Sequence, residues 1–252
     1  MIPKDVRDHH RLFDAHTHIG SARHSGRSCD AGAMLGHMDR FGIDRALLIP
    51  FPVVDDYRAA HDGIARAIDA HPARFAGAAC LNPFVSEQEY AAEVKRCAAL
   101  GFRALKIQPQ YQAVNPLSPR SAYVLDAAAS NGLALVCHTG TGVPFALPSL
   151  WIPAARRYPE LPIVLAHAGG GIYVLEAVVA AMECANVYIE LSSLMPHHVA
   201  EVLRYVDPSR LLIGSDLPES IEAEFGKILS MEIGEDARHA ILWQTAAKLF
   251  GA

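Results

Sequence analysis

Short apolar runs alternate with amphipathic segments along almost the whole chain. Several of these runs are continuously apolar, which is typical of parallel strands that are covered on both faces. Eight strands are predicted from them: Arg11–His16, Arg45–Ile49, Phe75–Leu81, Ala104–Ile107, Ala134–Cys137, Ile163–Ala166, Val187–Ile189 and Leu211–Ile213. The pattern therefore predicts an α/β protein with a large buried sheet.

Capping residues mark the helices between these strands. Asp30 can cap a helix that Gly42 ends, and Ser86–Glu89 forms a capping box for a helix that runs to Gly101. Three glycines, Gly169–Gly171, allow a sharp turn after the sixth strand, before an Ala/Val-rich helix. Strands and helices are thus predicted to alternate.

Eight strands that alternate with helices in 252 residues match a (β/α)8 TIM barrel, predicted as a single domain over residues 1–252. The rival fold is an open doubly wound sheet, which needs a Gly-rich phosphate-binding turn after its first strand. Here that turn is Gly20–His24, a poor match to such a motif. We therefore expect a barrel.

Composition narrows the range of partners. The net charge is −5 and no run of like charges occurs, which argues against a nucleic-acid partner because such binding needs a basic face. No apolar run reaches the ~18–20 residues of a membrane span, and Met1–Arg11 lacks the apolar core of a signal peptide. Five scattered cysteines without a C-x-x-C pair indicate a reduced, cytoplasmic protein.

Candidate metal ligands lie at the ends of the predicted strands. His16 and His18 stand two residues apart on the first strand, so their side chains share one face and can hold a divalent metal. His138, His167 and Asp216 end three later strands. The carboxyl ends of barrel strands surround one mouth, where active sites lie. We therefore expect these five residues to meet there.

On these residues, the chain resembles the amidohydrolase superfamily, in the branch of metal-dependent TIM-barrel hydrolases and decarboxylases. The segment Gly101–Pro109 also resembles that branch, whose fourth strand typically carries a lysine, here Lys106. The resemblance implies one bound divalent ion, Zn2+ or Mn2+, with four ligands: His16, His18, His138 and Asp216. It also implies that His167 binds a second ion or positions the attacking water.

This chemistry predicts a metal-dependent hydrolase that acts on a small, carboxylate-bearing molecule, an amide, a lactone or a related C–O or C–N bond. The metal lowers the pKa of bound water, Asp216 moves the proton, and His167 polarises the carbonyl or orients the water. An alternative is a nonoxidative metal-dependent decarboxylase of an aromatic or enoic acid. A silent metal-binding barrel that acts through a partner is a third reading, and a homo-oligomer is compatible with all three.

Residues at the mouth are candidates for substrate binding. Lys106 either carries a carboxylated amine that bridges two metals or, as we favour, a free ammonium that attracts an anion. The other candidates are Gln108 and Tyr111 after strand four, Arg23 and His24 on the first loop, Phe51, and Ser192 with Ser193. We interpret His61 and His197 as solvated residues on helix surfaces.

Overall fold

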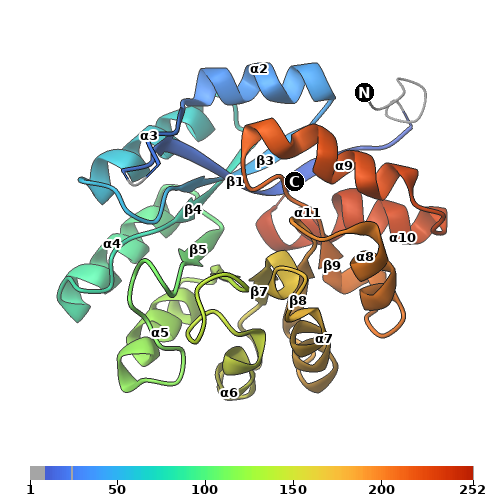
Figure 1. Cartoon of the computed structure of the whole chain (residues 1–252). Coiled ribbons are helices and arrows are strands. Elements are labelled where there is room, and N and C mark those ends of the chain that lie inside the picture. Colours follow the sequence, from blue (N-terminus) through green and yellow to red (C-terminus); the bar gives the residue numbers. More distant parts are fainter. Residues whose placement is uncertain (1–8, 24, 252) are drawn as a thin grey trace.

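The computed structural model describes residues 9–23 and 25–251. Nine strands form one curled sheet (Figure 1), in the order β2-β1-β3-β4-β5-β6-β7-β8-β9. They are β1 (Phe13–Ser21), β2 (Ser28–Cys29), β3 (Arg45–Pro50), β4 (Phe75–Ala79), β5 (Ala104–Ile107), β6 (Ala134–His138), β7 (Ile163–Ala166), β8 (Val187–Glu190) and β9 (Leu211–Leu212). All neighbours are parallel except β2, which pairs antiparallel with β1.

The sheet closes between β1 and the segment after β9. Ala15 N–H donates to the carbonyl oxygen of Ile213 at 2.9 Å, and Asp216 N–H donates to that of His16 at 2.7 Å. A parallel bridge also joins Thr17 and Asp216. The expected (β/α)8 barrel is therefore confirmed, with β2 as an added hairpin arm.

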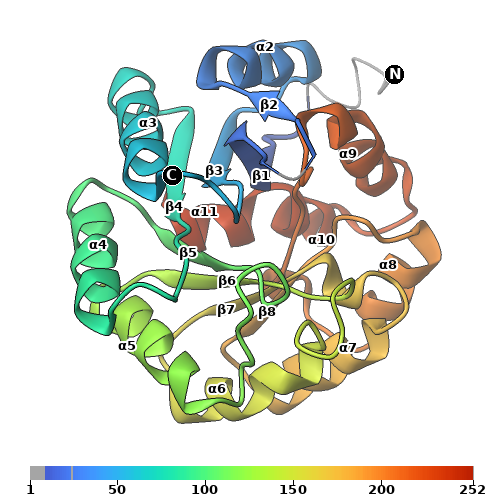
Figure 2. The ribbon, with the colours of Figure 1, turned by 60° about the vertical axis from the view of Figure 1, so that its left-hand side comes forward.

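Helices surround the strands (Figure 2). They are α2 (Ala31–Phe41), α3 (Tyr57–Ala70), α4 (Glu87–Ala99), α5 (Ala122–Ser130), α6 (Ile152–Arg157), α7 (Val174–Glu183), α8 (Pro196–Leu203), α9 (Ile221–Ser230), α10 (Glu235–His239) and α11 (Thr245–Phe250). Two predicted caps are confirmed, because Asp30 accepts from Ala33 N–H and Ser86 accepts from Glu89 N–H. Within the described residues, no helix is long and apolar enough to cross a membrane.

Aromatic side chains close the amino-terminal end of the barrel. The ring centroid of Phe13 lies 5.7 Å from that of Trp243 and 6.1 Å from that of Phe250. The Arg11 guanidinium lies 3.5 Å from the Trp243 ring centroid, a cation–π contact. The carboxyl ends of the strands are thus left as the face on which a site can form.

Gly214 allows β1 and the end of β9 to approach closely. A Cβ atom there would lie 2.6 Å from both the backbone nitrogen and the Cβ of His16. Any side chain at position 214 would therefore push apart the two segments that carry His16 and Asp216.

The expectation for His61 was wrong. Its side chain is fully buried between α3 and α4, with Nδ1 2.8 Å from Glu93 Oε1, and its Nε2 accepts from Cys80 N–H at 3.0 Å. Glu93 is also bound by Arg96. Cys97 lies in the same buried group, and together with His61 and Glu93 it offers atoms of the kind that bind metals. Both ring nitrogens of His61 are already engaged in hydrogen bonds, however, so this cluster serves to tie two helices to β4.

Candidate functional site

His16 and His18 direct the same ring nitrogen toward each other. Their Nε2 atoms are 3.3 Å apart. His18 Nδ1 lies 3.1 Å from the Pro50 carbonyl oxygen and His16 Nδ1 lies 3.3 Å from Glu190 Oε2. Both partners accept hydrogen bonds, so each Nδ1 carries the proton and each Nε2 keeps its lone pair. Two facing lone pairs suit a cation placed between them.

Asp216 adds a carboxylate to this pair. Its Oδ1 lies 3.7 Å from His16 Nε2 and 3.6 Å from His18 Nε2. Burial alone would raise the pKa of this carboxyl, but its electrostatic interactions with the adjacent imidazoles of His167, His16 and His18, and with the Lys106 amine, lower it well below its usual range. His16, His18 and Asp216 therefore form a compact group of ligand atoms.

His138 lines the same pocket but stands apart from that group. Its Nε2–H donates to the Thr141 carbonyl oxygen at 2.8 Å, which leaves the lone pair on Nδ1. Burial, assisted by the charge of Lys106, lowers its pKa to about 4. The same causes lower the pKa of His18 to about 4. Both rings are thus neutral near pH 7, the state in which imidazole binds a metal.

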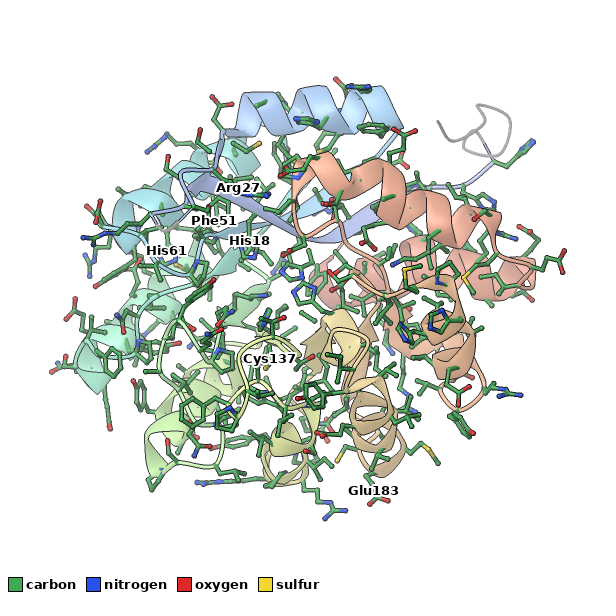
Figure 3. The ribbon with its side chains drawn as sticks, viewed as in Figure 1. His18, Arg27, Phe51, His61, Cys137 and Glu183 are labelled. Carbon is green, nitrogen blue, oxygen red and sulfur yellow. The ribbon has the colours of Figure 1, made fainter. Side chains whose placement is uncertain are left out.

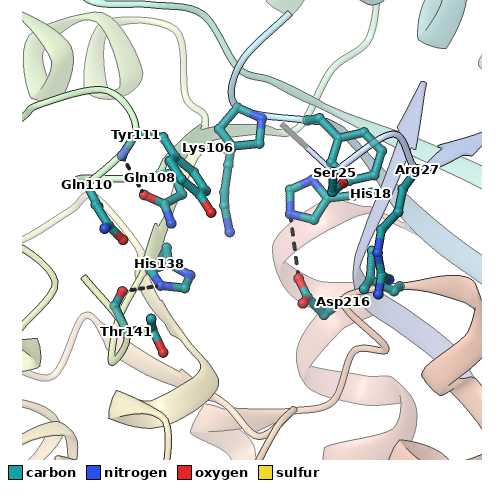
Figure 4. Close-up of a pocket in the computed structure, with 13 residues that line it drawn as sticks. His18, Ser25, Arg27, Lys106, Gln108, Gln110, Tyr111, His138, Thr141 and Asp216 are labelled. Atoms are coloured by element: carbon teal, nitrogen blue, oxygen red, sulfur yellow. Dashed lines mark hydrogen bonds and ion pairs between the residues drawn. The ribbon is translucent and has the colours of Figure 1, made fainter. Parts of the chain in front are cut away.

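Lys106 extends into the pocket between His138 and His18 (Figure 4). Its side chain is 1% exposed, and Nζ lies 2.9 Å from His16 Nε2. Burial lowers the pKa of the amine. Among the residues that the structure describes, no carboxylate oxygen lies within 4 Å of this amine. An anion in the pocket would supply the missing partner.

His167 occupies the turn after β7, behind the pocket. Its Nε2 lies 3.9 Å from Asp216 Oδ1, and its ring centroid is 4.9 Å from those of His16 and His138. His167, Ser193 and Asp216 all have a positive φ of 62–66°. Left-handed backbone is strained for residues other than glycine and clusters at functional sites. The backbone at this mouth therefore adopts an energetically unfavourable conformation.

Two buried carboxyl groups were missed from the sequence. Glu190, at the end of β8, accepts hydrogen bonds from the backbone N–H groups of Ser192, His167 and Gly214. Asp14 accepts from both the N–H and the hydroxyl of Ser215, and burial raises its pKa to about 7. Glu190 directly follows the apolar residues Val187–Ile189 of β8, and Asp14 lies between Phe13 and Ala15. A charged residue among apolar strand neighbours is the signal that could have revealed each.

A pocket of about 220 Å³ opens at this end of the barrel. Among the substrate candidates, Lys106, Gln108, Tyr111 and Phe51 line it. Phe51 stacks on His18, with centroids 5.2 Å apart and ring planes 17° apart. Aromatic and cationic groups thus share one small space.

The first loop contributes a different arginine from the one expected. Arg23 lies outside the pocket and pairs with Asp55 on the surface, whereas Arg27 lines the pocket near Phe51 and His18 (Figure 3) and pairs with Glu219. The hairpin between β1 and β2 holds Arg27 there. His24, the other candidate on this loop, lies outside the described residues. The hydroxyl of Ser192 is hydrogen-bonded to Glu190 rather than open to substrate.

Solved structures share this fold. A 5-carboxyvanillate decarboxylase from Novosphingobium aromaticivorans, with manganese and 4-hydroxy-3-methoxy-5-nitrobenzoic acid, has a TM-score of 0.76 at 16% identity, covering 96% of both chains. A 2,6-dihydroxybenzoate decarboxylase from Rhizobium has 0.75 at 17%, covering 96% of this chain and 98% of its own. A probable 2-pyrone-4,6-dicarboxylic acid hydrolase from Acinetobacter baumannii, with citric acid bound, has 0.73 at 17%, covering 96% and 100%.

No curated protein matches the sequence. A family model described as amidohydrolase, however, matches residues 13–252, which is nearly the whole chain and includes every candidate site residue. The chain therefore belongs to the amidohydrolase family.

Proposed function

We propose that this protein is a metal-dependent decarboxylase that removes carbon dioxide from a small hydroxylated aromatic acid without a redox step. The observation that carries the proposal is Lys106, a buried amine on the pocket floor with no carboxylate within 4 Å among the described residues. A substrate carboxylate would provide its counter-charge.

The residues that would hold the metal are His16, His18, His138 and Asp216. The unprotonated nitrogens and the ionised carboxylate fit such an ion, because imidazole and carboxylate are ligands of Zn2+ and Mn2+. A divalent ion there would stabilise negative charge that develops on the substrate oxygens. These four residues would complete a site for one ion. His167 would then not be needed as a metal ligand and could transfer protons.

The pocket walls suit a flat ring. Phe51 is 6% exposed and already stacks on His18, while Tyr111 stands on the loop after β5. Arg27 at the rim could meet a second polar group of the substrate. These residues would orient the ring so that its carboxylate points toward Lys106.

Decarboxylation needs a proton at the carbon that loses carbon dioxide. Asp216 Oδ1 and His167 Nε2, 3.9 Å apart, would together accept the proton of the substrate hydroxyl. As the C–C bond breaks, its electron pair stays on the ring carbon, which takes that proton back from the pair. The products are carbon dioxide and the phenolate, which is reprotonated by water.

The likeness to the vanillate and benzoate decarboxylases supports this reading over the hydrolase that the sequence first favoured. Hydrolysis stays a second candidate, because an ionised carboxylate beside the metal donors could equally take a proton from water. The fold shared with the pyrone dicarboxylic acid hydrolase favours the same candidate. In both reactions the substrate would be an acid.

One assay separates the two candidates. Protein loaded with Zn2+ or Mn2+ would be incubated with hydroxybenzoates labelled with ¹³C at the carboxyl carbon, and in parallel with lactones and amides that carry a carboxylate. We expect labelled carbon dioxide from at least one hydroxybenzoate and none with His18→Ala. Ring opening or amide cleavage without release of carbon dioxide would instead establish the hydrolase.

A further inference from the structure

A chain of buried hydrogen bonds runs from Glu190 through Ser192 to His167. The Ser192 hydroxyl lies 2.8 Å from Glu190 Oε2 and 2.7 Å from His167 Nδ1. Glu190 and Ser192 are fully buried, and His167 is 5% exposed. Water therefore has little access to these bonds, and each must be satisfied within the protein.

The protons in this chain can be assigned by counting donors. Glu190 already accepts from three backbone N–H groups, of Ser192, His167 and Gly214, which fixes it as an acceptor. The single hydroxyl proton of Ser192 must then go to Glu190 Oε2, because otherwise two bare oxygens would face each other at 2.8 Å. The serine oxygen is left to accept, so His167 Nδ1 must be the donor.

We infer that Ser192 is a positioning residue that holds His167 in the Nδ1–H tautomer. The Nε2 lone pair then points toward Asp216 Oδ1, 3.9 Å away. The bond from His167 N–H to Glu190 Oε2, at 3.1 Å, fixes the backbone of the histidine to the same carboxylate. The ring of His167, through Ser192, and its backbone N–H are therefore both oriented by Glu190.

This tautomer sets what His167 can do. A neutral ring with a bare Nε2 accepts a proton on that side and cannot polarise a carbonyl by donating one. The proton acceptor of the proposed reaction is thus prepared by a residue that does not touch substrate. This role of His167 rests on the proposed function, whereas the tautomer itself does not.

The tautomer can be measured directly in protein labelled with ¹⁵N-histidine and loaded with Zn2+. Two-bond ¹⁵N–¹H correlation distinguishes a protonated from a bare ring nitrogen, and the His167 signals are identified by their loss in His167→Gln. We expect Nδ1 protonated and Nε2 bare in the wild type and in Ser193→Ala, which alters the exposed neighbouring hydroxyl. In Ser192→Ala we expect a mixture of tautomers or Nε2–H. A wild-type Nε2–H tautomer, or an unchanged tautomer in Ser192→Ala, would overturn the inference.

Kinetics supply the second readout. With the substrate found by the carbon dioxide assay, Ser192→Ala should lower kcat by ~10²-fold, in the range of general base catalysis, with KM and metal content near wild type. Ser192→Thr, which keeps the hydroxyl, should restore most of kcat. Equal losses in the alanine and threonine variants would contradict the role of the hydroxyl. The expected tautomer in a protein that releases no carbon dioxide would instead refute the proposed function and leave the inference standing.

Discussion

Each imidazole at the site has a hydrogen-bond partner on the side away from the pocket, and that partner determines which ring nitrogen faces the pocket. His18 is fixed by a backbone carbonyl and His16 by Glu190, so both present Nε2. His138 uses Nε2 for Thr141 and presents Nδ1. Such second partners orient metal ligands and set their protonation. Each ring therefore already presents an unprotonated nitrogen to the pocket, as the proposed metal site requires.

The carboxylate charge of Asp216 should be needed for turnover more than for metal binding. Asp216→Asn keeps an oxygen near His16 and His18 but removes the proton acceptor. We expect kcat to fall by at least ~10²-fold, the usual contribution of general base catalysis. Elemental analysis should show metal content close to wild type. Near-normal turnover with metal bound would rule out this role for Asp216.

Lys106 should matter for binding of the acid. Lys106→Met keeps an unbranched side chain, one atom shorter, and removes its charge, so KM for an anionic substrate should rise while metal content stays unchanged. Calorimetric titration with an unreactive benzoate would report the same loss. A fall in metal content, partly restored by added short-chain carboxylates, would instead show that Lys106 is carboxylated and bridges two ions.

At the scale of elements, the site depends on how closely β1 and the end of β9 meet. The proposed ligands His16 and Asp216 come from chain segments 200 residues apart in sequence, brought together by backbone hydrogen bonds across the seam. Glycine at position 214 makes this approach possible. The seam and the donor group are therefore a single structural feature.

Gly214→Ala should disturb both the seam between β1 and the end of β9 and the group of ligand atoms beside it. The new Cβ would meet backbone atoms of His16 that cannot move aside, and such overpacking costs about 1–3 kcal/mol. We expect a lower denaturation midpoint in urea and weaker metal binding. Gly36→Ala is the matched control, because Gly36 lies in α2 and, apart from the backbone of that helix, no atom of the described residues lies within 4 Å of the added Cβ. The control should be neutral or stabilising; equal behaviour of the two variants would show that the seam tolerates a side chain.

The contact between α3 and α4 should make the protein sensitive to acid. Burial lowers the pKa of His61, so below pH 6.5 the unfolded chain takes up a proton that the folded chain does not. Burial would raise the pKa of Glu93, but hydrogen bonds from Arg96 and His61 lower it overall. Its contribution is therefore present above pH 4.5 and is lost as the pH falls through its lowered folded value.

We expect the free energy of unfolding to fall from pH 7 toward pH 4, and Glu93→Gln to flatten the part of this decline below pH 4.5. Urea unfolding at a series of pH values, with the surface variant Glu87→Gln as control, would test this. A wild-type stability independent of pH over that range would contradict the assignment.

Across the whole molecule, the parts predicted from sequence are those with a periodic or capping signal. All eight barrel strands and the caps at Asp30 and Ser86 follow from local pattern. The two-residue strand β2 has no such pattern, and it decides that Arg27 rather than Arg23 lines the pocket. His61 depends on contacts between distant segments, so its burial could not be read from its neighbours in sequence.

Metal removal should lower the thermal stability of the whole barrel, because the proposed ligands come from β1, β6 and the segment after β9. A ligand present at 100 times its Kd stabilises the folded state by about 2.7 kcal/mol. In a protein of this size each kcal/mol moves Tm by about 2–4 °C. We therefore expect purified protein to hold roughly one equivalent of Zn2+ or Mn2+, and Tm to fall after chelation and recover when metal is restored. The matched variant His18→Ala should show neither change. Protein that holds no metal, takes up none and keeps one Tm throughout would contradict a metal centre at this mouth.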